Sequence, residues 1–222
     1  MPASGGLEGG TMYLFTRMAR LAATHVVDGV EWAATITDKV NQITSLDVGL
    51  WASMLSPRLG AVSWGCAVES LADLEDADAK LMADPIYLDL VTKGATITTG
   101  EFDDLTAQYV FNPAPDLDAK YVAVVQGQLA NGAFGRGMGV GVEIAERATA
   151  IAGGTASTSF LVGVTGGYGS CAWITGAATL RDLERAEQAV NTSAEFIALI
   201  DEKAADCFLP GVTTQEIWRR LH

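Results

Sequence analysis

The sequence predicts an α+β fold made of two similar halves, each with the element order β-α-β-β-α-β. Two observations predict it: short apolar segments and amphipathic helices follow in the same order twice, and the chain aligns with itself after one constant shift. The halves should span residues 11–111 and 119–222, joined by a Pro-rich linker at 112–118. Residues 1–10 are rich in glycine and lack apolar periodicity, so a flexible segment is expected there.

The first half should contain a strand, a helix, a hairpin of two strands, a second helical stretch and a closing strand. Their expected ranges are 12–21, 26–43, 48–54 with 61–68, 71–91 and 95–110. The corresponding elements of the second half are expected at 121–129, 137–152, 157–165 with 170–175, and 180–203. The closing segment 213–221 is predicted to be a short helix, because Thr213 or Thr214 could cap it with Glu216 close behind.

The internal repeat is clearest in the second helical stretch of each half. The shift that takes Leu71 to Leu180 aligns LADLEDAD with LRDLERAE without a gap, and five of these eight positions are identical. The same shift places Trp64 on Trp173 and Arg17 on Gln126. A tandem duplication explains these matches together, although two amphipathic helices could also resemble each other by chance.

A family resemblance rests on the strand with Trp64, the helix LADLEDA from Leu71, and the segment ADPIYLDLV from Ala83. This pattern resembles the second half of dimeric α+β barrel domains, particularly the NIPSNAP-like and antibiotic-biosynthesis-monooxygenase-like groups. The resemblance implies two ferredoxin-like halves whose sheets face inward, with the helices outside. In a tandem copy, one chain would supply both halves of an intramolecular barrel and enclose one cavity.

Composition narrows the possible partners and compartment. The net charge of −13 opposes binding to nucleic acid and to anionic membranes. Three scattered cysteines give neither a disulfide framework nor paired zinc ligands, so we expect a reducing, cytoplasmic setting, no metal and no cofactor. A small-molecule ligand or substrate is the expected partner, and the high apolar content of 49% also permits a homo-oligomer.

The candidate ligand site follows from the alternation of side chains along the first strand. Tyr13, Phe15 and Arg17 share one face, which we expect to line the barrel interior, while Leu14, Thr16 and Met18 should face the helices. A buried cation beside an amide could bind an anionic or carbonyl ligand, although Arg17 could instead reach solvent or pair with an acid. The full set of expected ligand-binding residues is Tyr13, Phe15, Arg17, Trp51, Trp64, Gln126 and Trp173.

The remaining motifs carry weaker signals. The glycine-rich run from Gly135 to Gly141 enters a helix, where it could hold a phosphate, but close packing of the helix against the sheet is the simpler reading. The two histidines, His25 and His222, suggest no catalytic constellation, so no catalytic residue is assigned. We therefore expect a barrel that binds a small apolar or aromatic molecule. The alternative is a cofactor-independent monooxygenase or isomerase acting on an aromatic or polyketide-like substrate.

Overall fold

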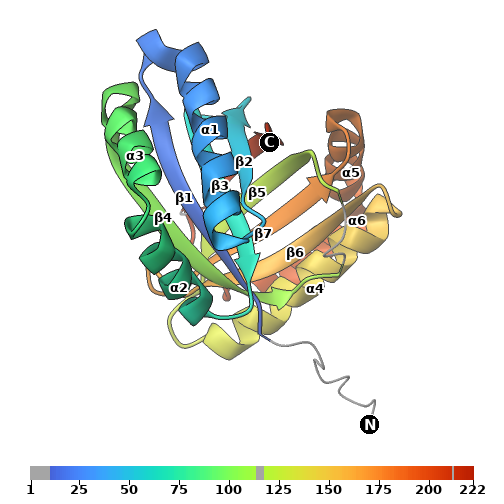
Figure 1. Cartoon of the computed structure of the whole chain (residues 1–222). Coiled ribbons are helices and arrows are strands. Elements are labelled where there is room, and N and C mark those ends of the chain that lie inside the picture. The colour runs from blue at the N-terminus through green and yellow to red at the C-terminus, as the bar shows by residue number, and fades with distance from the viewer. Residues whose placement is uncertain (1–10, 114–117, 212) are drawn as a thin grey trace.

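A computed structural model describes residues 11–113, 118–211 and 213–222. The expected flexible segment 1–10 and the middle of the expected linker, 114–117, lie outside the described residues. In the described part of the chain, eight antiparallel strands close into a barrel and the helices cover its outside (Figure 1). The predicted α+β class and the barrel are confirmed.

The strands and helices follow each other in two similar series. The strands are β1 (Tyr13–Leu21), β2 (Gly49–Met54), β3 (Ala61–Val68), β4 (Thr98–Phe111), β5 (Tyr121–Gln128), β6 (Ala156–Gly163), β7 (Ser170–Ala177) and β8 (Thr214–Arg220). The α-helices are α1 (Val26–Thr44), α2 (Leu71–Met82), α3 (Pro85–Ile97), α4 (Phe134–Ala152), α5 (Leu180–Thr192) and α6 (Ala194–Leu199). A 3-10 turn, Ala23–His25, precedes α1, and a π-helical turn, Ile200–Ala204, follows α6.

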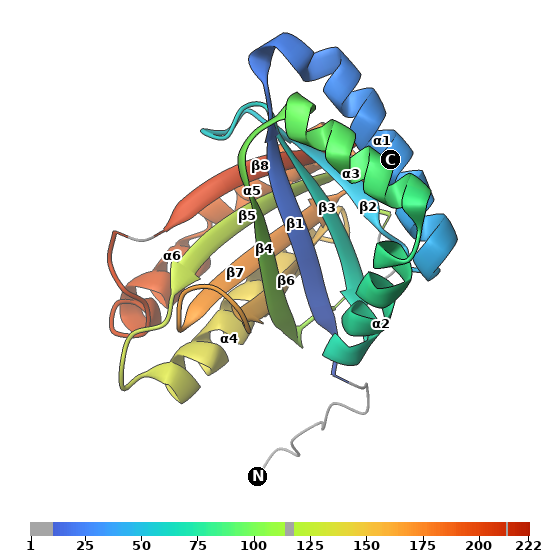
Figure 2. The ribbon, with the colours of Figure 1, turned by 60° about the vertical axis from the view of Figure 1, so that its left-hand side comes forward.

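The order of strands around the barrel is β1-β3-β2-β8-β5-β7-β6-β4. Each half therefore forms a four-stranded sheet with the same order, β4-β1-β3-β2 in the first and β8-β5-β7-β6 in the second. Pairing of β2 with β8 and of β4 with β6 joins the two sheets edge to edge. Figure 2 shows α1, α2 and α3 outside the first sheet and α4, α5 and α6 outside the second.

Local sequence signals explain where several helices begin. The Ser70 hydroxyl accepts a hydrogen bond from the backbone N–H of Asp73, and the Asp73 carboxylate accepts one from the N–H of Ser70, which completes a capping box at α2. Asp84 caps α3 by accepting a hydrogen bond from the N–H of Tyr87, and Pro85 occupies the first turn, where no N–H is needed. The Asp84-Pro85 break thus starts a second helix instead of ending the helical stretch.

The prediction of a closing helix at 213–221 is wrong, because this segment forms strand β8. Its residues alternate between faces: Glu216 and Trp218 are buried, whereas their neighbours are more exposed. β8 fills the position between β2 and β5, where both neighbours need hydrogen-bonding partners. The helix-capping pattern around Thr214 therefore does not decide the structure of this segment. Backbone pairing with the edges of β2 and β5 does.

The glycine-rich run lies inside α4 and packs closely, as the simpler reading of the sequence predicted. A Cβ atom at Gly137 would lie 2.6 Å from a Leu129 side-chain carbon, and one at Gly141 would lie 2.3 Å from Cζ of Phe160. Both distances are far below van der Waals contact. At Gly137 the Leu129 side chain would have to shift, whereas at Gly141 the fully buried Phe160 ring has little room to move, so α4 can approach the sheet this closely only with glycine at Gly141. Among the described residues, every helix is too short or too polar to span a bilayer.

Candidate functional site

Cavities lie at three places in the described part of the molecule. The first, of about 640 Å³, lies between the outer face of the first sheet and helices α1, α2 and α3. The second, of about 620 Å³, has the corresponding place under α4, α5 and α6. The third, of about 400 Å³, lies within the barrel and is lined by residues from all eight strands.

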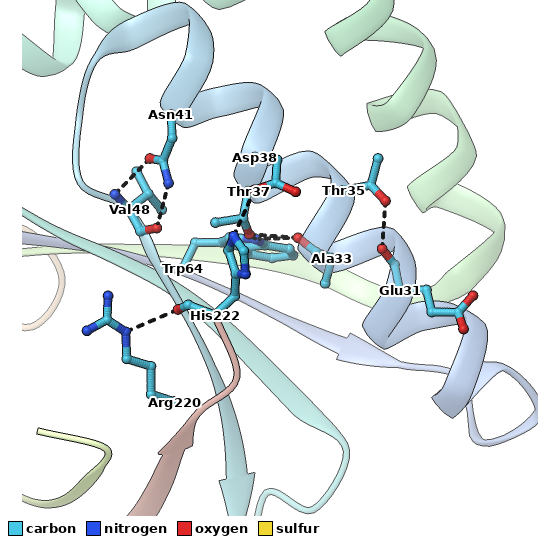
Figure 3. Close-up of polar contacts among 10 residues, drawn as sticks. All are labelled: Glu31, Ala33, Thr35, Thr37, Asp38, Asn41, Val48, Trp64, Arg220 and His222. Carbon is cyan, nitrogen blue, oxygen red and sulfur yellow. Dashed lines mark hydrogen bonds and ion pairs between the residues drawn. The ribbon is translucent and has the colours of Figure 1, made fainter. Parts of the chain in front are cut away.

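Aromatic side chains form the walls of the first cavity. Trp32 of α1 and Trp64 of β3 meet edge to face with ring centroids 5.7 Å apart, and Phe102 stacks on Trp64 at 6.5 Å. Figure 3 shows the indole of Trp64 directed at α1, where its N–H donates to Thr37 Oγ1 over 3.0 Å. Because Trp32 and Trp64 are fixed by packing and hydrogen bonds, they form a rigid part of the wall against which a planar ligand could lie.

A charged pair lies at the edge of this aromatic pocket. Arg17 of β1 donates from Nε and Nη2 to both carboxylate oxygens of Asp104 of β4, each over 2.7 Å. This hydrogen bonding raises the pKa of Arg17 despite partial burial, so the guanidinium stays charged. The guanidinium carbon also lies 5.8 Å from the ring centroid of Phe15. Charge and aromatic surface are therefore adjacent in one cavity.

Two other ionisable groups of the first cavity stay neutral. Burial raises the pKa of the Tyr87 phenol, although the nearby Arg17 charge works in the opposite direction. Burial also raises the pKa of the Cys66 thiol to about 11, and on the other half it raises that of Cys171 to about 12. These groups can donate or pack, but neither thiol is a nucleophile near neutral pH.

The buried thiols give a prediction that is simple to measure. In the folded protein at pH 8, Cys66 and Cys171 should react with an aromatic disulfide reagent far more slowly than after denaturation, because they are both buried and protonated. Ionisation is less favourable in the folded state, so the stability should fall as the pH rises from about 9 toward 11. Fast labelling of the native protein at pH 8 would contradict this description.

The second cavity resembles the first in position but differs in charge. Trp173 corresponds to Trp64 in the hydrogen-bond register, and its indole N–H donates to the Gly141 carbonyl over 2.9 Å. Val125 lies opposite Trp173 where Arg17 lies opposite Trp64, so this cavity lacks the matching cation. One of its two acids, Glu187, accepts a hydrogen bond from Gln215 over 3.0 Å, and burial raises the pKa of Glu187.

The structure corrects the predicted faces of β1. Leu14, Thr16 and Met18 line the barrel interior, whereas Phe15 and Arg17 line the first cavity under the helices. The alternation along the strand was correctly identified, but the two faces were exchanged. Both faces of this strand are covered by other parts of the protein, so the residue pattern alone does not tell inside from outside.

The seven residues proposed as ligand-binding therefore do not surround a single cavity. Phe15, Arg17 and Trp64 line the first cavity, Trp173 lines the second, and Trp51 and Gln126 line the barrel interior. Tyr13 packs against the core of the first half. Their binding roles remain predictions.

The self-alignment of the sequence paired Gln126 with Arg17, and the strand registers show why this pairing is wrong. Arg17 lies opposite Trp64, but Val125, and not Gln126, lies opposite Trp173. A displacement of one residue moves a side chain to the other face of a strand, and Gln126 consequently points into the barrel. Sequence reasoning also missed Asp104, whose partnership with Arg17 depends on the β1–β4 register. The only local signal was an acidic pair, Asp103-Asp104, inside an otherwise extended segment.

Comparisons with known proteins support the fold. No family model and no curated protein matches the sequence. Among solved structures, a candidate monooxygenase from Fusobacterium nucleatum has a TM-score of 0.69 at 7% identity, covering 96% of this chain and 94% of its own. An anthrone oxidase-like protein has a TM-score of 0.58 at 11% identity, with 97% and 93% covered. Chlorite dismutase from Candidatus Nitrospira defluvii has a TM-score of 0.56 at 12% identity, with 93% and 90% covered.

These similarities extend over nearly the whole chain and identify the class of fold. The chain is an α+β barrel protein, which agrees at this coarse level with the resemblance noted in the sequence. At such identities the similarity shows the fold alone. In the described residues, no group of three or more His, Cys, Asp or Glu side chains lies close enough to hold a metal ion.

Proposed function

We propose that the chain is an oxygenase that binds a planar aromatic or polyketide-like compound in the first cavity and oxidises it with O2 as the only co-substrate. The observation that carries the proposal is the bidentate Arg17–Asp104 pair beside the stacked rings of Trp64 and Phe102. The similarity to the candidate monooxygenases and to the anthrone oxidase-like protein favours oxidation over simple binding.

The cavity offers separate features for binding and for chemistry. A volume of about 640 Å³ can hold a molecule of two or three fused rings. Trp64 would pack on a face of those rings, and Trp32, which is perpendicular to Trp64, would contact their edge. Arg17 would lie near an oxygen on the edge of the ligand and stabilise negative charge on it, since its guanidinium keeps its own charge.

The proposed reaction converts a methylene between two aromatic rings into a carbonyl. Asp104 removes one proton from the methylene carbon, and Arg17 stabilises the resulting enolate oxygen. The enolate transfers electrons to O2, a carbon–oxygen bond forms, and the peroxide loses water to leave the carbonyl. The balance is one CH2 and one O2 giving one C=O and one H2O.

Anthrone is a suitable test substrate, because its methylene lies between two rings and opposite a carbonyl. We expect the purified chain to convert anthrone to anthraquinone with matching O2 consumption, measured by absorbance and an oxygen electrode, above the rate with heat-denatured protein. Arg17→Met should lower kcat/KM about 100-fold, the effect of removing a group that stabilises developing negative charge. Asp104→Asn should lower kcat with a smaller effect on KM.

Arg147→Met is a matched control, because Arg147 forms an ion pair with Glu195 on the other half. It should retain full activity. If anthrone binds with an affinity that depends on Arg17 but is not oxidised above background, the protein is a binding barrel and the oxygenase proposal is wrong. If neither binding nor oxidation depends on Arg17, the first cavity is not the site.

We also propose that the two halves are copies of one ferredoxin-like unit, as the sequence repeat predicts. The support is their common strand order and the matching positions of β3 and β7, which begin at Ala61 and Ser170. Helices α2 and α5 begin at Leu71 and Leu180, which are separated by the same number of residues as Ala61 and Ser170. Of the two resemblances, the monooxygenase-like group is favoured over the NIPSNAP-like one by the candidate monooxygenases.

A further inference from the structure

One tryptophan differs from the others in its hydrogen bonding. The indole N–H groups of four tryptophans donate to protein acceptors: Trp32 to the Leu90 carbonyl, Trp64 to Thr37, Trp173 to the Gly141 carbonyl and Trp218 to Glu216. Trp51 of β2 forms no such hydrogen bond with the described residues, although it is half-buried and lines the barrel interior. The Trp51 N–H is not sealed within packed protein but is accessible from the cavity, so it is available to donate to a molecule that occupies the interior.

Two glycines leave space beside the free N–H of Trp51. Gly49 of β2 and Gly65 of β3 lie directly opposite each other in the strand register, and both face the interior. A Cβ atom at Gly49 would lie 3.2 Å from Trp51 Nε1, and one at Gly65 would lie 4.0 Å from it. An acceptor oxygen could therefore occupy the region that these two missing side chains leave open.

The rest of the interior is mainly apolar and is lined partly by small side chains. Leu14, Val122, Val124 and Ile174 face it, together with Ala107 and Ala172. An eight-stranded barrel is just wide enough to be filled by its own side chains or to hold one small ligand. Small residues at these positions leave a cavity of about 400 Å³, much larger than the voids in a packed core.

Two of the three charged side chains that line the interior have partners, and the third, Asp47, is exposed and forms no ion pair or side-chain hydrogen bond with the described residues. Glu216 is buried, accepts a hydrogen bond from Trp218 over 3.2 Å and pairs with Arg58 over 2.9 Å. Arg220 donates to the backbone carbonyl of His222 over 3.2 Å, a contact drawn in Figure 3. The free donor of Trp51 thus faces a mainly apolar space in which Glu216 is already neutralised and the negative charge of Asp47 would oppose an anionic ligand. Such a site suits an uncharged acceptor.

We propose that the barrel interior is a second binding site, for a compact, uncharged apolar molecule whose carbonyl or ether oxygen accepts a hydrogen bond from Trp51. The site is separate from the first cavity, because adjacent residues of β3 point to opposite sides of the sheet. Trp64 lines the first cavity and Gly65 lines the interior. This inference does not depend on the proposed oxygenase activity.

A pair of probes of equal shape tests the role of the free N–H. The probes are 2-acetylnaphthalene and 2-isopropenylnaphthalene, in which a C=CH2 group replaces the C=O group. We expect the whole protein to bind the ketone about three- to tenfold more tightly than the alkene, as one neutral hydrogen bond allows. Trp51→Phe should remove this preference and keep the affinity for the alkene. Isothermal titration calorimetry measures both affinities.

Matched variants separate the interior from the other cavities. Gly65→Ala should weaken binding of both probes, and it should still fold, because its Cβ would make only ordinary contacts of 3.6 Å or more. Trp173→Phe in the second cavity and Arg17→Met in the first should keep the ketone preference. If Trp51→Phe retains the preference, or if Arg17→Met or Trp173→Phe removes it, the interior site is refuted. The anthrone experiment has no bearing on that result.

Discussion

Trp64→Ala should destabilise the protein by about 3–5 kcal/mol, the cost expected when a large aromatic side chain is removed from a core. Trp64 is 8% exposed, packs against Trp32 and Phe102, and donates a hydrogen bond to the fully buried Thr37. The wall of the first cavity would collapse or fill with water. Chemical denaturation followed by circular dichroism should show a lower midpoint with an unchanged denaturant slope.

Trp51→Ala is the matched comparison for this variant. Trp51 is only half-buried, borders an existing cavity and donates to no described residue, so its removal should cost roughly 1–2 kcal/mol. The two tryptophans thus separate a structural role from the proposed ligand-binding role. Equal losses of stability would contradict the distinction between a packed indole and one that faces a cavity.

Gly141→Ala should lower the free energy of unfolding by about 1–3 kcal/mol, the range typical of an overpacked core. The new Cβ atom would lie 2.3, 2.5 and 2.6 Å from three atoms of the Phe160 ring, which is 0% exposed and has little room to move. Helix α4 would have to move away from the sheet. Thermal denaturation should give a clearly lower Tm for this variant than for the unchanged protein.

Gly139→Ala tests the same substitution two residues earlier on the same helix. A Cβ atom at Gly139 would meet nothing within 4 Å, so the substitution should stabilise α4 by about 0.5–1 kcal/mol through the better helix propensity of alanine. Opposite signs for the two variants are the expected result. If both were stabilising, α4 would not approach β6 as closely as the structure shows.

Most elements of the fold could be predicted because they depend on local pattern. Apolar residues at helical spacing predicted α1, and the Pro57 to Gly60 turn predicted the hairpin of β2 and β3. Strand β8 could not be predicted in this way, because what makes it a strand is its pairing with β2 and β5. A helix cap contributes about 1 kcal/mol, whereas without β8 the edges of β2 and β5 would each present a row of unpaired backbone N–H and C=O groups.

The candidate site depends on orientation more than on composition. The sequence predicted that Arg17 and Trp64 line the same cavity, and both line the first cavity. It placed them inside the barrel, because alternation along β1 separates two faces without saying which one the helices cover. The residues that complete the site, Trp32 and Asp104, come from α1 and β4, which are separate from β1 in the sequence.

The sequence by itself determined the α+β class, the order of nearly all elements and the repeat of Leu71 at Leu180, because each of these follows from patterns within a few turns or strands. Only the tertiary structure decided which face of β1 lies inside, which residue lies opposite Trp64, and how the two sheets close. Those properties depend on strand register, and a displacement of one residue exchanges the two faces of a strand. Register is set by pairing between distant segments, as in the contact of Arg17 with Asp104, and it cannot be read from either segment alone.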